Sequence, residues 1–76
     1  MTYPKVPANM PTPVEVDVRI KVTYKYYATE EEARIAADYF REEAAYKHSL
    51  GYDFGYNSPG YVGLQSRNGL WLAIAP

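Results

Sequence analysis

The sequence predicts an α+β fold: an antiparallel sheet of three to four strands with one helix on a face, in the order β-α-β-β. Three observations lead to this fold class. Apolar and polar residues alternate over residues 14–27, helical signals cover residues 29–50, and Asn68-Gly69 separates two apolar runs. Alternation is typical of a half-buried strand, and Asn-Gly of a tight hairpin. We expect one domain at 14–76 after an extended, proline-rich arm at 1–13.

Composition restricts the possible classes of function. A chain of 76 residues forms one domain with a small core, and the absence of cysteine excludes disulfides and thiolate metal sites. A net charge of −1 provides no overall field that would attract nucleic acid or an anionic membrane. No apolar run approaches the roughly 20 residues that cross a bilayer, and the N-terminus lacks the apolar segment of a signal peptide. We expect a cytoplasmic protein, in the host cytoplasm if a phage encodes it.

The arm contains Pro4, Pro7, Pro11 and Pro13, which favour extended backbone. Two arrangements are open. The arm lies on its own domain or stays mobile, or it reaches a partner in a polyproline-like conformation.

Residues 14–27 are predicted to form one long strand with one buried face and one solvent-exposed face. The apolar set is Val14, Val16, Val18, Ile20, Val22, Tyr24 and Tyr26. The intervening residues are acidic early, at Glu15 and Asp17, and basic later, at Arg19, Lys21 and Lys25. A straight strand of this length would measure roughly 45 Å, so part of its edge is expected to lie beyond the shorter strands. Such an edge invites strand addition by a copy or a partner.

Thr29 and Glu32 form a capping box that starts a helix, which should run to about Leu50 before a left-handed cap at Gly51. The helix carries two neighbouring apolar stripes. The first stripe contains Ala33, Ala36, Ala37, Phe40 and Ala44. The second contains Ile35, Tyr39, Tyr46 and Leu50. The second stripe either covers the edges of the core or meets another chain, where tyrosine is enriched.

Three further strands are predicted, at 52–56, 61–66 and 70–75. A two-residue turn at Asn68-Gly69 would place Arg67 opposite Leu70 and Val62 opposite Ala75. One face of this hairpin then carries Val62, Leu64, Trp71 and Ala73, and the other carries Leu70, Leu72 and Ile74. Both faces are apolar, so one of them needs a cover other than the helix.

No catalytic, metal or cofactor motif is present. His48, the single histidine, suits the cationic last turn of the helix. The glutamates read as capping and solvated charges, no metal-ligand spacing appears, and the glycines form no phosphate loop. We therefore expect a protein that is not an enzyme and that holds no cofactor.

The leading hypothesis is a small protein-binding module that modulates or inhibits a protein partner by occlusion or bridging. A homodimer through the long strand or the helix is also expected. The predicted contact residues are Tyr27, Ile35, Tyr39, Tyr46 and Trp71. In size and in the lack of an active-site motif the chain resembles small phage and mobile-element proteins that block a host machine, such as anti-CRISPR proteins. This resemblance covers no particular residue.

The alternative hypothesis is a single-stranded nucleic-acid-binding domain, in which aromatic side chains stack on bases beside basic residues. Its candidate residues are Arg19, Lys21, Lys25, Tyr52, Tyr56 and Arg67. The basic-glycine-aromatic pattern of an RNA-recognition motif is absent from the sequence. A pocket for a small ligand, lined by tyrosines, is a third hypothesis.

Overall fold

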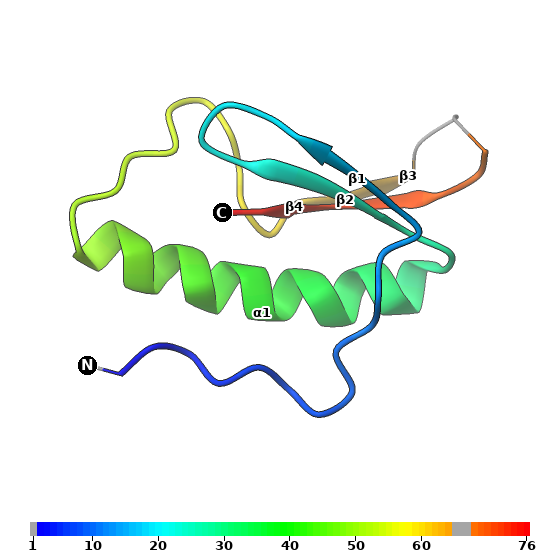
Figure 1. Ribbon diagram of the computed structural model, residues 1–76, viewed down its shortest axis with the longest axis horizontal. Helices are drawn as coiled ribbons and strands as arrows, with labels where there is room; N and C mark the ends of the chain where they lie inside the picture. The colour runs from blue at the N-terminus through cyan, green and yellow to red at the C-terminus, as the bar shows by residue number, and fades with distance from the viewer. Residues whose placement is uncertain (1, 65–67) are drawn as a thin grey trace.

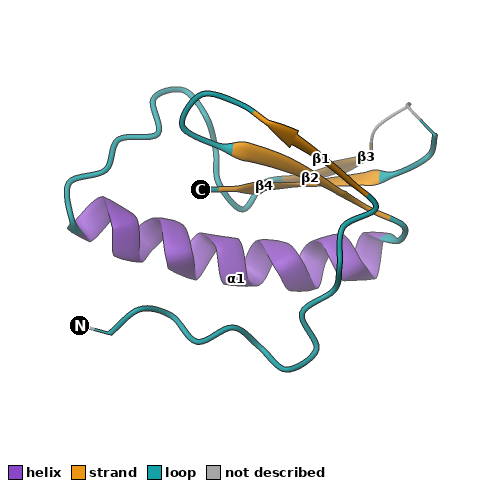
Figure 2. Ribbon diagram, viewed as in Figure 1, coloured by secondary structure: helices purple, strands orange, loops and turns teal. Residues whose placement is uncertain are grey.

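The computed structural model describes residues 2–64 and 68–76. One helix packs on a four-stranded antiparallel sheet, which confirms the predicted α+β class (Figures 1 and 2). The sheet order is β1-β2-β4-β3, so β2 and β4 are central and β1 and β3 form the two edges. The elements are β1 (Glu15–Val18), β2 (Thr23–Tyr27), α1 (Glu30–Ser49), β3 (Val62–Leu64) and β4 (Trp71–Ala75).

The single strand predicted over residues 14–27 is wrong, because the chain folds back on itself at residues 19–22. The Arg19 amide donates to the Val22 carbonyl at 2.9 Å, and Lys21 adopts a φ of 72°. A left-handed residue other than glycine costs about 1 kcal/mol. A straight strand of roughly 45 Å would exceed the longest dimension of the molecule, 37 Å. Folding back instead gives β2 two hydrogen-bonded neighbours, β1 and β4.

The fold-back also separates the predicted apolar set onto two faces of the sheet. Val16 lies opposite Lys25 and Val18 opposite Thr23, and these β2 residues share the helix side with Tyr27. The apolar residues of the second half of the set point to the other face instead, where Val22, Tyr24, Tyr26, Leu72 and Ile74 gather. In the hairpin an even-numbered residue of β1 pairs with an odd-numbered residue of β2. Even-numbered residues that would share one face of a straight strand therefore lie on opposite faces of the sheet in β1 and in β2.

The helix follows its sequence signals closely. The Thr29 hydroxyl accepts from the Glu32 amide at 3.2 Å, as the capping box predicts. At the other end Gly51 has a φ of 95°, and its amide donates to the His48 carbonyl. The buried helix residues are Ala33, Ala36, Ala37, Tyr39 and Phe40. The alanines of the first stripe thus let α1 lie close against β4, β3 and β2.

The C-terminal hairpin has the predicted faces but a different register. Val62 pairs with Ala73 and Leu64 with Trp71, two residues away from the expected pairing. A shift of two residues preserves the alternation, so the assignment of side chains to faces is correct. Asn68 and Gly69 have the positive φ values, 58° and 65°, that the Asn-Gly signal predicts, but the observed register does not fit a two-residue turn at these positions. The predicted pairs of residues 65–67 lie outside the described residues.

Residues 52–56 form no strand, contrary to prediction, and instead make a loop over the second face of the sheet. The Gly55 amide donates to Asp53 Oδ1 at 2.9 Å, and the Asn57 amide to the Phe54 carbonyl at 3.2 Å. These local bonds hold Phe54 against the cluster that contains Val22 and Leu72. The second apolar face therefore receives its cover from within the chain.

Candidate functional site

The residues predicted to contact a partner do not form one exposed surface. Tyr27 is fully buried between the sheet and α1, so its assignment as a contact residue is wrong for this fold. Burial raises the pKa of its hydroxyl to about 12, and this hydroxyl has no hydrogen-bond partner among the described residues. Trp71 is half-buried beside the same core and lines a polar pocket of about 360 Å³.

The other three predicted contact residues lie on α1 beneath the N-terminal arm, which runs along the helix (Figure 1). Tyr39 is only 8% exposed and belongs to the core, while Ile35 and Tyr46 are half-buried. The Tyr3 ring meets the Tyr46 ring edge-on at 5.0 Å, and the Tyr3 hydroxyl donates to Glu43. The arm thus lies on its own domain and covers the second stripe of the helix.

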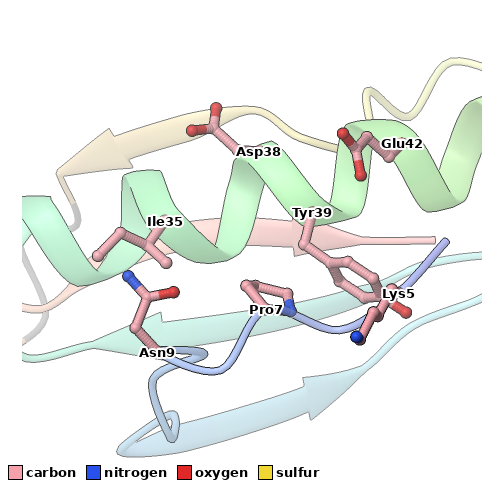
Figure 3. A pocket seen from close by; sticks show the side chains of 7 residues that line it. All are labelled: Lys5, Pro7, Asn9, Ile35, Asp38, Tyr39 and Glu42. Carbon is pink, nitrogen blue, oxygen red and sulfur yellow. The ribbon is translucent and has the colours of Figure 1, made fainter.

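A pocket of about 290 Å³ remains between the arm and α1. Figure 3 shows Pro7 and Asn9 of the arm facing Ile35 and Tyr39 of the helix. The pocket is shallow, and both apolar and charged side chains line it, so we assign no ligand to it.

The basic residues of the nucleic-acid hypothesis lie on different faces of the sheet. Lys25 is on the helix side, with its ammonium 5.3 Å from the centre of the Phe40 ring. Arg19 is on the opposite face, 4.7 Å from the centre of the Tyr24 ring. Lys21 lies in the β1–β2 turn, Tyr52 and Tyr56 are exposed in the loop after α1, and Arg67 lies outside the described residues. The sheet therefore separates Lys25 from Arg19, whereas the Lys21 ammonium lies near Gly55, the neighbour of Tyr56 in the chain.

The sheet has two edge strands, β1 and β3, and the outer edge of β1 carries the more exposed apolar side chains. Within the described part of the chain, no strand pairs with β1 on the side away from β2. Because Arg19 is hydrogen-bonded to Val22, the alternation of an antiparallel ladder makes Asp17 and Tyr24 the next bonded pair. The backbone groups of Val16 and Val18 therefore point outward and remain ready to pair with another strand.

An apolar row accompanies this free edge. Val14, Val16, Val18 and Ile20 are 60%, 53%, 78% and 86% exposed. Val16 and Val18 lie on the helix side of the sheet, Val14 comes directly before β1 and Ile20 lies in the β1–β2 turn. The helix α1 packs on β2, β3 and β4 and, among the described residues, does not reach β1. Figure 2 shows β1 at the margin of the sheet, farthest from the helix. We call these four residues the β1 row.

The opposite face of β1 is charged. Asp17 and Arg19 form an ion pair at 2.8 Å, and Arg19 also stacks on Tyr24. Asp17 raises the pKa of Arg19 by accepting its hydrogen bond, so this guanidinium stays charged. The edge therefore presents outward backbone groups, an apolar row on one face and paired charges on the other.

Sequence reasoning identified a free strand edge but assigned its apolar row to the buried side. The length of the alternating run was the available signal, because 14 residues exceed what the shorter strands can pair with. That excess is consistent with a hairpin, although residues 19–22 contain no glycine, asparagine or proline to mark the turn.

Nothing in the described residues resembles a metal or membrane-spanning site. No group of three histidine, cysteine or acidic side chains that could hold a metal ion occurs in residues 2–64 and 68–76. In the same ranges no helix is long and apolar enough to cross a membrane. Comparisons of the chain with protein-family models, with curated proteins and with solved structures found no match.

Proposed function

We propose that this chain is a non-enzymatic protein-binding module that takes up a strand of its partner along the outer edge of β1. The observation that carries the proposal is the combination of outward backbone groups and an exposed apolar row on one edge strand. Main-chain hydrogen bonds supply affinity in strand addition, and alternate side chains supply specificity. A module of this kind, acting in the cytoplasm, modulates its partner by occluding a surface or by bridging two chains.

Natural proteins usually protect an edge strand with lysine, proline, a bulge or a covering loop. The two residues whose backbone groups point outward are both valine, so neither lysine nor proline protects the edge at these positions. The arm covers part of α1, and Phe54 packs on the second face of the sheet, whereas other large apolar side chains such as Leu50, Tyr56 and Leu64 stay exposed at separate places. The uncovered β1 row therefore supports binding here more than at the helix residues predicted from sequence.

The test is a pull-down from source-cell lysate with the tagged full chain, read by mass spectrometry. We compare the wild type with Val16→Lys/Val18→Lys and with a control, Leu50→Lys/Tyr56→Lys, which changes exposed apolar residues away from β1. We expect one protein in stoichiometric amount with the wild type and the control, and its loss with the β1 variant. Because lysine opposes edge pairing, the loss should be nearly complete.

Nuclease treatment of the lysate separates protein binding from nucleic-acid binding. Recovery that is equal for the wild type and the β1 variant would contradict the proposal. Recovery that disappears with nuclease would instead favour the nucleic-acid alternative, whose binding should also weaken steeply with salt.

A further inference from the structure

We propose that the strand that occupies the β1 edge belongs to a second copy of this chain, which pairs antiparallel with β1 about a two-fold axis. This inference rests on the proposed function, because it names the partner of the same edge. Two sheets joined in this way become one sheet of eight strands with both helices on the same side.

Charge complementarity selects the second copy as the partner. The charged face of β1 and of the residue that follows it reads acid, acid, base at Glu15, Asp17 and Arg19. An antiparallel copy presents the same series in reverse, so acids can face bases in both directions. Opposite charges directly across a strand pair stabilise it by about 0.2–1 kcal/mol each, and like charges destabilise it.

The charges also select one register. Pairing Val18 with Val18 of the second copy places Asp17 opposite Arg19 in both directions. A shift of two residues one way would place Asp17 opposite its own copy, and a shift the other way would do the same for Arg19. Shifts of one residue would turn inward-pointing backbone groups of the second copy toward β1 and lose the bonding pattern.

The apolar row gains a partner in the same register. Val18 meets its own copy at the axis, and Val16 lies toward the β1–β2 turn of the second copy, where Ile20 is 86% exposed. Because a two-fold axis perpendicular to the sheet keeps each face on its own side, both β1 rows lie side by side in the strip between the two helices. Cross-strand contact between aliphatic side chains removes apolar surface from water on the residues that are now the most exposed.

The experiment is sedimentation analysis of the purified full chain over about 5–500 μM, since an interface of a few strand residues is small and expected to be weak. We expect a concentration-dependent dimer. Asp17→Arg alone and Arg19→Asp alone each place like charges opposite one another and should weaken the dimer at least about tenfold. Glu31→Arg, which makes the same change of charge at an exposed position of α1, is the control and should dimerise like the wild type.

The decisive experiment mixes the two single variants in equal amounts. In the mixed pair, position 17 of one chain faces position 19 of the other with opposite charge in both directions, so a heterodimer should form within about threefold of the wild-type affinity. The double variant Asp17→Arg/Arg19→Asp should dimerise with itself in the same way. Circular dichroism of each variant checks that the fold is unchanged.

A monomeric wild type across the concentration range would overturn the inference, as would a mixture of the two variants that stays monomeric while both are folded. If the chain is monomeric and the β1 variant still loses a lysate protein, only the inference fails, and the partner is a different protein. If neither dimer nor β1-dependent partner appears, the proposed function fails with it.

Discussion

Gly60 connects the loop after α1 to the sheet, and it can hardly be replaced. Its amide donates to the Ile74 carbonyl at 2.8 Å, and its carbonyl accepts from Arg41 Nη1 at 2.7 Å. Its φ is 90°, which side chains rarely tolerate. A Cβ at this position would lie 2.1 Å from Arg41 Cγ. One small residue thus ties the start of β3 to both β4 and the helix.

Gly60→Ala is expected to lower the free energy of unfolding by about 2–4 kcal/mol, through backbone strain and through displacement of Arg41. The matched control is Gly51→Ala, because Gly51 has a similar φ of 95° but no neighbouring atom within 4 Å of the added Cβ. The control should lose only about 1–2 kcal/mol. Urea denaturation of both variants measures the difference, and equal losses would show that the Arg41 contact is unimportant.

At the scale of elements, the arm acts as a third layer outside the helix. It has no strand or helix of its own in residues 2–14, yet Met10 packs against the core and Tyr3 binds Tyr46 and Glu43. Bonding to Glu43 raises the pKa of the Tyr3 hydroxyl, which remains protonated at neutral pH. The tyrosines of α1 therefore serve as attachment points for the arm.

Tyr39→Ala is accordingly expected to destabilise the fold, by about 3 kcal/mol or more, because its ring is buried at the junction of the arm and the core. Tyr52→Ala, at an exposed aromatic ring, should change stability by less than about 0.5 kcal/mol. Thermal unfolding followed by circular dichroism compares the two. If Tyr39→Ala keeps the stability of the wild type and loses only partner binding, the helix face would be supported as an interaction surface after all.

The whole molecule is thin, with extents of 37 × 28 × 15 Å, and its helix covers three of the four strands. A small domain buries a limited share of its surface and has little stability in reserve. Pairing through β1 would extend the sheet and add buried apolar area where the helix does not reach. Dimerisation and stability are then linked, because a partner that binds only the folded state stabilises it.

The unfolding midpoint of the wild type is therefore expected to rise with protein concentration. Between about 5 and 500 μM the midpoint should increase by several degrees. A hundredfold rise in protein concentration stabilises the folded dimer by up to about 2.7 kcal/mol per dimer, the limit that is reached when the chain is dimeric over the whole range. Asp17→Arg should have a midpoint that is independent of concentration. Differential scanning calorimetry measures both, and a constant wild-type midpoint would argue against a linked dimer.

Local chemistry made much of this fold predictable. The capping box at Thr29, the left-handed cap at Gly51 and the positive φ values of Asn68 and Gly69 depend on neighbouring residues, and all three are observed. The alternation of the C-terminal strands also assigned their faces correctly, because a two-residue shift in register leaves the faces unchanged. The free edge was expected as the overhang of one long strand, whereas it is the outer side of β1 after the run folds into two paired strands.

The tertiary structure alone decided where that run turns, which face each half presents and what covers the helix. The turn at Lys21 has no local signal, and it forms because β2 gains ladders with both β1 and β4 that a straight strand would lack. The position of the arm on α1 likewise depends on contacts between distant residues, such as Tyr3 and Glu43, which are 40 positions apart. Short-range signals set the ends of elements, whereas pairing and packing between distant segments set their partners, and those partners left the β1 row exposed.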